Sequence, residues 1–207
     1  MDIQFYGANC LSLTHKGTRV VIDDNLAVLA AKAVTKADDV SLCTMAPKDR
    51  PAGRLLFDGP GEYEVADISI VGIGARAHMD AENSQRATMF KLFTGEYSML
   101  VTGHIYPELS EAQLEAIGMV DVLAVPVGGN GYTVDPVGAL KLIKAIEPKL
   151  VIPTHYADKS LKYPVPQQDL TAALKEIGME PKETTAKLKL KPGELGDITQ
   201  LVVLEKS

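Results

Sequence analysis

The chain has 207 residues, of which 46% are apolar, and 27 acidic against 21 basic side chains give a net charge of −6. A chain of this length and composition buries a substantial core, and no stretch reads as a linker, so we expect one domain over residues 1–207. The basic residues are scattered, which argues against a nucleic-acid partner or an anionic membrane surface.

No stretch reaches the roughly 18 apolar residues that a membrane span needs, and the N-terminus lacks the pattern of a signal peptide. Cys10 and Cys43 are isolated thiols without CxxC spacing, as is typical of a reducing compartment. We therefore expect a cytoplasmic protein that acts on a small-molecule substrate or ligand. The oligomeric state is left open.

The first half of the chain predicts mainly β-strands. Alternating or continuous apolar residues indicate strands at 3–6, 10–14, 19–22, 40–43, 55–57, 68–73, 88–93 and 97–101. Residues Leu26 to Ala37 are rich in Ala and Leu and predict a short helix. His15 precedes a Lys-Gly turn, and we expect it at the surface.

The second half predicts alternating helices and strands. Ser110 is a candidate N-cap for a helix to about residue 117, and Asp135 followed by Pro136 predicts the start of a second helix. A third helix is expected over 167–177, and strands over 122–127, 150–152 and 201–204. Strands first and helix–strand alternation later indicate two sheets covered by helices.

Three of the four histidines each follow a strand-like apolar run: His78, His104 and His155. A single histidine in such a place is more often structural than functional. Three in matching contexts make a shared site about as probable as three structural roles, because strand ends at one sheet edge gather functional groups. Imidazole is the commonest metal ligand and a frequent general base.

The order of elements makes the chain similar to a known family. Asp23 follows the third predicted strand, Pro126-Val127-Gly128-Gly129 follows a buried strand, and Ile152-Pro153-Thr154-His155-Tyr156 lies near the end. Ala75-Arg76-Ala77-His78 matches an Ala-x-His loop of the same family. Over nearly its whole length the chain resembles the metallo-β-lactamase superfamily, and within it the small bacterial branch of uncharacterised hydrolases and lactonase-like proteins. The resemblance implies an αββα sandwich, in which two mixed β-sheets are flanked by helices and metals bind in a cleft at one sheet edge.

The chain departs from the family at its main metal-binding segment. Where the family has Thr-His-x-His-x-Asp-His, this chain has Thr44-Met45-Ala46-Pro47-Lys48-Asp49-Arg50. In that register the three histidines are replaced by Met45, Pro47 and Arg50, and only Asp49 remains. Proline has no ligand atom, arginine is a fixed cation and methionine is a poor donor for the usual divalent ions. The active site is degenerate, and the family's two-metal centre cannot form in the usual way.

The resemblance still implies a smaller site. His78 and His155 match ligand positions of the family, and His104 stands where the family has a bridging aspartate. Together with Asp49 these histidines would make one zinc-like site, so we expect at most one divalent ion, zinc first, or none. The other residues expected to line the cleft are Asp23, Met45, Arg50, Gly128, Gly129 and Tyr156.

Two functions follow from this reading. The first is a metal-dependent hydrolase acting on an ester, lactone or phosphoester, with water bound to the metal as nucleophile and no catalytic side chain identified. The second is a metal-free binding or regulatory module in which Arg50 pairs with Asp49. The retained histidines favour the hydrolase. The preference is slight, because the fold alone does not establish the chemistry.

Overall fold

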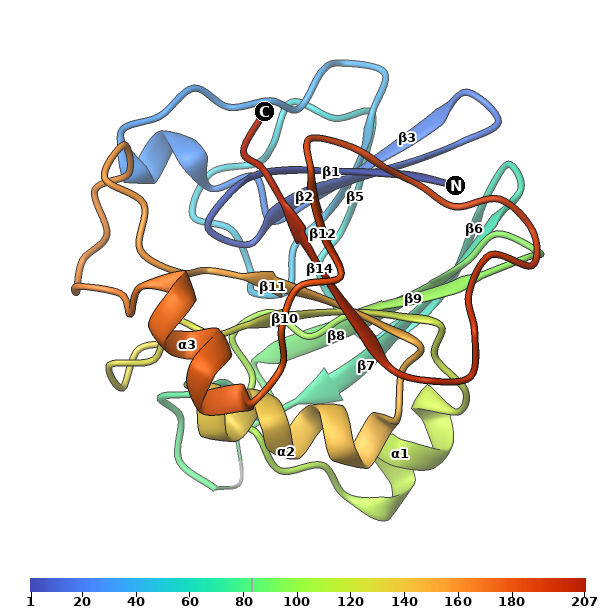
Figure 1. The fold of residues 1–207 in the computed structure, drawn as a ribbon. Helices are drawn as coiled ribbons and strands as arrows, with labels where there is room; N and C mark the ends of the chain where they lie inside the picture. The colour runs from blue at the N-terminus through green and yellow to red at the C-terminus, as the bar shows by residue number, and fades with distance from the viewer. Residues whose placement is uncertain (83) are drawn as a thin grey trace.

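The computed structural model describes residues 1–82 and 84–207, and their strands form two β-sheets that pack face to face (Figure 1). The smaller sheet has the strand order β13-β1-β2-β3-β4-β5. Its strands are β1 (Asp2–Gly7), β2 (Cys10–His15), β3 (Thr18–Ile22), β4 (Val40–Leu42), β5 (Leu55–Phe57) and β13 (Leu188–Lys189).

The larger sheet has eight strands in the order β12-β14-β11-β10-β9-β8-β7-β6. They are β6 (Gly61–Val65), β7 (Ile68–Ala75), β8 (Ala87–Phe93), β9 (Ser98–Val101), β10 (Val122–Pro126), β11 (Leu150–Thr154), β12 (Glu183–Thr185) and β14 (Gln200–Leu204). Parallel pairs join β9, β10, β11 and β14, whereas β6 to β9 pair antiparallel. The mixed α/β architecture with two mixed sheets confirms the predicted fold class.

The alternation of side chains along β10 explains its continuous apolar run. Val122 and Ala124 face the core between the two sheets, whereas Leu123 and Val125 face the core beneath the helices. A strand that is buried on both faces needs apolar residues at every position.

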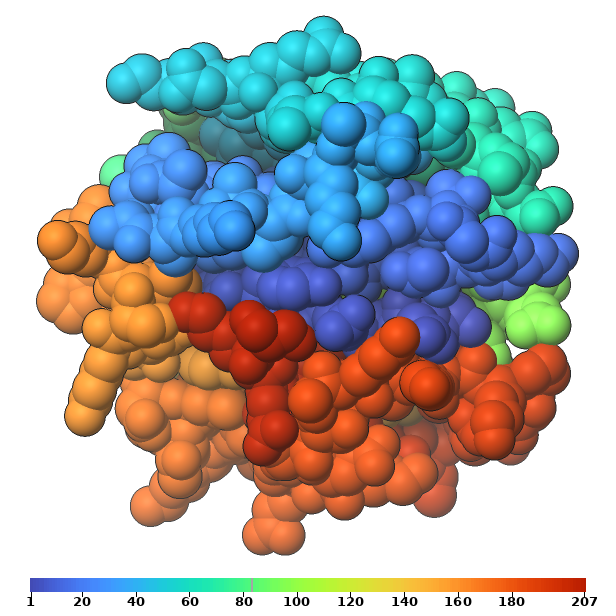
Figure 2. Space-filling view, turned by 90° about the horizontal axis from the view of Figure 1, so that it is seen from above, coloured from blue at the N-terminus to red at the C-terminus, as the bar shows by residue number. Residues whose placement is uncertain are grey.

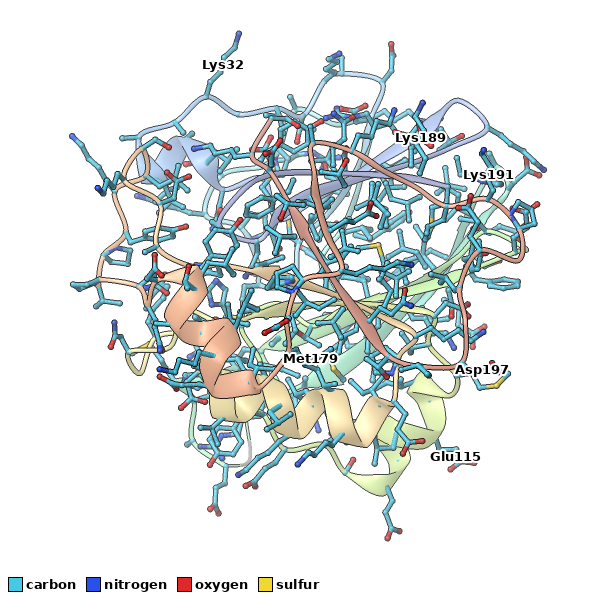
Figure 3. The ribbon with its side chains drawn as sticks, in the orientation of Figure 1. Lys32, Glu115, Met179, Lys189, Lys191 and Asp197 are labelled. Carbon is cyan, nitrogen blue, oxygen red and sulfur yellow. The ribbon has the colours of Figure 1, made fainter. Side chains whose placement is uncertain are left out.

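Three helices cover the outer face of the larger sheet: α1 (Glu111–Ile117), α2 (Pro136–Ile146) and α3 (Leu170–Ile177) (Figure 1). The predicted caps form. Ser110 makes a capping box with Gln113, and the Asp135 carboxylate accepts a hydrogen bond of 2.6 Å from the Gly138 N–H. The exposed charged residues Lys32, Glu115 and Asp197 point away from the body of the molecule (Figure 3). No helix of the described chain is both long enough and apolar enough to span a bilayer.

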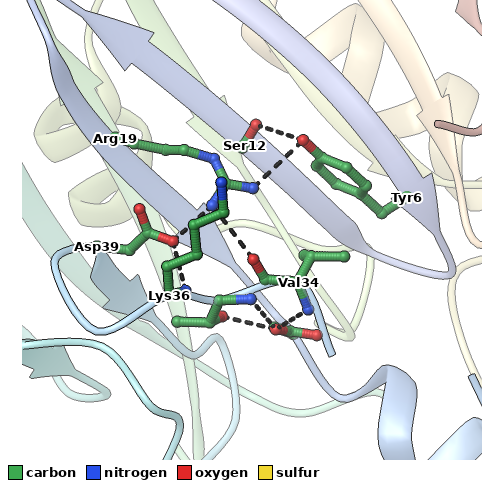
Figure 4. A network of polar contacts seen from close by, with 8 residues as sticks. Tyr6, Ser12, Arg19, Val34, Lys36 and Asp39 are labelled. Carbon is green, nitrogen blue, oxygen red and sulfur yellow. Dashed lines mark hydrogen bonds and ion pairs between the residues drawn. The ribbon is translucent and has the colours of Figure 1, made fainter. Parts of the chain in front are cut away.

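The helix predicted for residues 26–37 is wrong: only a 3₁₀ helix, η1 (Leu26–Leu29), forms there. The Asp24 carboxylate accepts hydrogen bonds from the backbone N–H groups of Val34 (2.8 Å) and Thr35 (2.7 Å). Asp39 in turn accepts from the Lys36 N–H and is paired with Arg19 (Figure 4). Side chains that hydrogen-bond to the backbone compete with the helix, and here they hold the segment extended.

Three strands were not predicted. β6 is an edge strand in which Glu62 and Glu64 are exposed, so it lacks an apolar pattern; its Tyr63 stacks on Phe57 with ring centroids 4.2 Å apart. β12 and β13 are three and two residues long, too short for a periodic signal. The C-terminal tail continues past β14 and lies against the first strands (Figure 2), where the Ser207 N–H donates to the Phe5 carbonyl.

Candidate functional site

The predicted histidines lie in loops at one edge of the larger sheet. β9, β10 and β11 are parallel, and β7 runs in the same direction because two antiparallel pairings separate it from β9. The carboxyl ends of these strands therefore meet at one edge. His78 follows β7, His104 follows β9 and His155 follows β11.

His104 and His155 are in contact, with ring centroids 4.6 Å apart and ring planes at 80°. Two contacts hold His155 in place. Its Nδ1 lies 3.0 Å from the Gln167 side-chain oxygen, and its backbone N–H donates to the Ala8 carbonyl at 2.7 Å. Its φ of 51° is unusual for a residue other than glycine, and strained backbone of this kind is maintained where the surrounding structure requires it. Gly128 makes room for this loop, because a Cβ there would come within 2.0 Å of the His155 carbonyl oxygen.

His78 lies beside His104 through the backbone. The His78 N–H donates to the His104 carbonyl at 2.7 Å, and Ala77 forms a β-bridge with Ile105. The His78 ring lies 6.2 Å from the Tyr106 ring, centroid to centroid. The three strand-end histidines are thus brought to one region.

Burial keeps the histidine pair neutral. It lowers the pKa of His104 to about 3, with further contributions from His155 and His78, and it lowers the pKa of His155 to about 4 against the opposing effect of the Gln167 hydrogen bond. Within the described chain, the buried Nδ1 atoms of His78 and His104 have no hydrogen-bond partner. Both rings of the pair are therefore uncharged at neutral pH and can offer a lone pair.

Two tyrosines complete the cleft and were not predicted. The Tyr132 ring lies 5.4 Å from His104 and 6.0 Å from His155, and the Tyr163 ring lies 5.0 Å from His155. Tyr132 follows the glycine-rich turn after β10, where Gly129 has a φ of 65°. This turn is the feature of the sequence that could have indicated Tyr132 as a site residue. Nothing in the sequence near Tyr163 marks it.

Residues 44–50, the segment predicted to replace the family's metal-binding motif, line a cavity of about 380 Å³ together with His104 and Asp23. Met45, Asp49 and Arg50 are among the lining residues. Asp49 and Arg50 are exposed, and among the ion pairs of the described residues none joins them. The predicted pairing of these two side chains is therefore not present.

Asp23 anchors this segment. Its carboxylate accepts hydrogen bonds from the Thr44 N–H (2.7 Å) and the Thr44 hydroxyl (2.6 Å). Burial raises the pKa of Asp23 to about 6, although the Thr44 hydrogen bonds oppose the shift. The Thr44 carbonyl accepts from Thr88, so Thr44 joins the two sheets at the cleft.

Some predicted placements need correction. Gly128, Gly129 and Tyr156 are not among the residues that line the cavity. The Tyr156 ring packs 5.6 Å from Phe5, and its hydroxyl donates to the Leu204 carbonyl. His15 is 9% exposed rather than a surface residue, because the β2–β3 hairpin lies against the β6–β7 turn, where Lys16 pairs with Asp67 at 3.6 Å. His15 ends β2 in the smaller sheet, whereas the other three histidines follow strands of the larger sheet.

A complete metal site is not assembled. In residues 1–82 and 84–207, no three His, Cys, Asp or Glu side chains form a group that could hold a metal ion. Asp49 is exposed on its loop, so the four-ligand set of Asp49, His78, His104 and His155 stays a prediction. The donors that the structure brings together are the two neutral imidazoles of His104 and His155.

Comparison with known proteins agrees with this architecture. Residues 2–155 match the family described as the β-lactamase superfamily domain. The chain belongs to this family. Among solved structures, an inferred Zn-dependent hydrolase of the metallo-β-lactamase superfamily from Thermotoga maritima is 26% identical, with a TM-score of 0.75 over 99% of this chain and 98% of that one. Igni18, a metallo hydrolase from Ignicoccus hospitalis, has a TM-score of 0.63 at 16% identity over 92% of this chain and 99% of that one. At this low identity the likeness shows a shared fold and nothing more.

Curated relatives match shorter segments of the chain. A UPF0173 metal-dependent hydrolase of Carboxydothermus hydrogenoformans is 39% identical over 67 residues, which are 32% of this chain and 29% of that protein. One from Desulforamulus reducens is 37% identical over 78 residues, 38% of this chain and 31% of that protein. The chain thus matches about a third of the length of these relatives, which are named as metal-dependent hydrolases.

Proposed function

We propose that this chain is a hydrolase with a reduced metal site, which holds at most one divalent ion at His104 and His155, with His78 beside them. The observation that carries the proposal is the orientation of His155. The Gln167 side-chain N–H donates to the Val165 carbonyl at 2.9 Å, so the Gln167 oxygen faces His155 and its Nδ1 must be the protonated nitrogen. The lone pair of His155 is then on Nε2. A hydrogen bond that fixes an imidazole in this way is typical of metal-ligand histidines.

Zinc suits these donors best, because neutral imidazole is among its usual ligands. When bound, a divalent ion supplies Lewis acidity toward the carbonyl oxygen of an ester or lactone or the oxygen of a phosphoester. The chain's own contribution is to keep both imidazoles neutral and to surround them with the rings of Tyr132 and Tyr163. We also place the protein in the cytoplasm, which the two buried free thiols, Cys10 and Cys43, support.

One observation favours a second candidate, a metal-free binding or regulatory module. The described residues offer no group of three metal donors, and Arg50 puts a cation at the cavity where the family has a ligand. The histidine pair would then serve as a neutral wall of a ligand pocket.

Metal content and thermal stability separate the two candidates. We expect protein purified without a His-tag and without added metal to carry no more than one equivalent of divalent ion, and zinc to raise its melting temperature by mass action. His155→Ala should abolish the zinc response, whereas His15→Ala, which alters a remote histidine, should keep it. Two equivalents after dialysis would contradict the reduced site. No metal and no zinc response would leave the metal-free module.

A further inference from the structure

Arg76 lies two residues before His78, directly after β7, and is held in a fixed position. Its guanidinium lies over the Tyr106 ring, 4.0 Å from the centroid, and its Nε donates to the Asp80 carbonyl at 2.8 Å. The backbone supports this arrangement, because the Tyr106 N–H donates to the Arg76 carbonyl at 2.9 Å. The guanidinium is therefore oriented before any ligand arrives.

Arg76 is half-buried and forms no ion pair, a combination that no other arginine of the described chain shows. Arg19 and Arg86 are paired with Asp39 and Asp80, and Arg50 and Arg54 are exposed. No carboxylate of the described residues lies within ion-pairing distance of Arg76, although acids outnumber bases 27 to 21. The nearby Asp80 carboxylate is already occupied by Arg86 and Ser84.

The free side of Arg76 borders a cavity of about 580 Å³, which Tyr106, Gln85, Ser110 and Gln113 also line. Tyr106 stands between this cavity and the histidines, since its ring contacts Arg76 and lies 6.2 Å from the His78 ring. A substrate that occupies the cavity would have to extend past Tyr106 to reach the histidines.

We propose that Arg76 binds a singly charged oxyanion group of the substrate, a carboxylate or a phosphodiester, while the bond to be cleaved lies at the histidines. The planar fork of a guanidinium matches two oxygens of such a group. Glu82 and Glu108 also line the cavity and are exposed, so Arg76 can offset one negative charge of a ligand, whereas a second charge would only be repelled. The link to cleavage rests on the proposed hydrolase function, whereas the binding of the anion does not.

Binding is tested with the whole protein by titrating benzoate or dimethyl phosphate while the arginine side-chain Nε–H signals are followed by NMR. We expect the Arg76 signal to shift and saturate with at least one of the two probes, and the probe that saturates identifies the oxyanion. Arg76→Gln should weaken binding about 10- to 100-fold, the usual effect of losing a charged hydrogen-bond partner. Arg76→Lys, which keeps the charge without the fork, should fall between. Arg54→Gln removes an exposed arginine and should change nothing.

Cleavage is tested with two esters that share a leaving group, neutral 4-nitrophenyl butyrate and singly charged mono-4-nitrophenyl succinate. We expect kcat/KM to favour the charged ester and Arg76→Gln to abolish that preference while the neutral ester is little affected. If neither ester is hydrolysed, ester cleavage is excluded as the proposed reaction, and the titration alone decides the anion site. An Arg76 signal that does not saturate with either probe, or equal binding to Arg76→Gln, would overturn the inference.

Discussion

Gly103 lies directly against Thr44, so that a Cβ at Gly103 would come within 2.1 Å of the Thr44 hydroxyl oxygen. Gly103 has a φ of 61° and immediately precedes His104, while Thr44 is hydrogen-bonded to Asp23. The position of His104 therefore depends on close packing between a turn of the larger sheet and the end of β4.

Gly103→Ala should destabilise the protein by about 2–4 kcal/mol, because it adds both a steric overlap and left-handed backbone strain. Gly95→Ala is the matched control: Gly95 has a φ of 83°, but a Cβ there meets nothing within 4 Å. Denaturant unfolding should show about 1–2 kcal/mol for the control, the strain alone. Equal losses for the two variants would show that the Thr44 contact is unimportant.

Gln167→Ala should cost about 1–3 kcal/mol of unfolding free energy, because it leaves the buried Nδ1–H of His155 without its acceptor. Gln168→Ala is a suitable control, since the Gln168 side chain bonds only to Glu176 in an exposed contact. Urea unfolding measures both. A loss for Gln167→Ala no larger than that for Gln168→Ala would remove the argument that Gln167 orients His155.

Stability should fall as the pH is lowered from about 6.5 toward 4 in metal-free protein. The pKa values of His104 and His155 are lowered to about 3 and 4, so in this range the unfolded chain takes up protons that the folded chain does not. Each such histidine contributes a slope of about 1.4 kcal/mol per pH unit. Denaturant unfolding between pH 7.5 and 4.5 measures the slope.

Asp23 acts in the opposite direction, because its pKa is raised to about 6. Its contribution to stability is complete below the unfolded value of about 3.9 and is lost as the pH rises through 6. Asp23→Asn should therefore make the acid-side loss of stability steeper. A shallower pH dependence in this variant would contradict the raised pKa of Asp23, because it would mean that this carboxyl itself adds to the acid-side loss of stability.

The triple variant Met45→His, Pro47→His, Arg50→His should raise zinc uptake, because these positions line the cavity that His104 also lines. Melting curves with and without zinc measure the gain. The same three changes combined with His104→Ala should show a smaller gain. No gain in either background would mean that residues 44–50 do not face the histidines, and Asp49 would be withdrawn from the site.

Local patterns predicted most of the secondary structure. β10 was visible as an apolar run, and α1 and α2 were visible from the caps Ser110 and Asp135, because these signals depend on neighbouring residues only. The segment after Asp24 was mispredicted because its conformation depends on hydrogen bonds to side chains ten or more residues away. The Ala- and Leu-rich composition of this segment does not indicate those hydrogen bonds.

The sequence by itself determined the two-sheet family fold and the three strand ends that carry His78, His104 and His155, and it predicted the loss of three metal-ligand histidines. Only the tertiary structure decided that His104 and His155 touch, that Gln167 and two tyrosines surround them, that Asp49 stays exposed and that Tyr156 turns into the core. The reason is physical: strand periodicity places a residue at a sheet edge. Its side-chain direction and burial depend on loops that are brought together only when the two sheets pack.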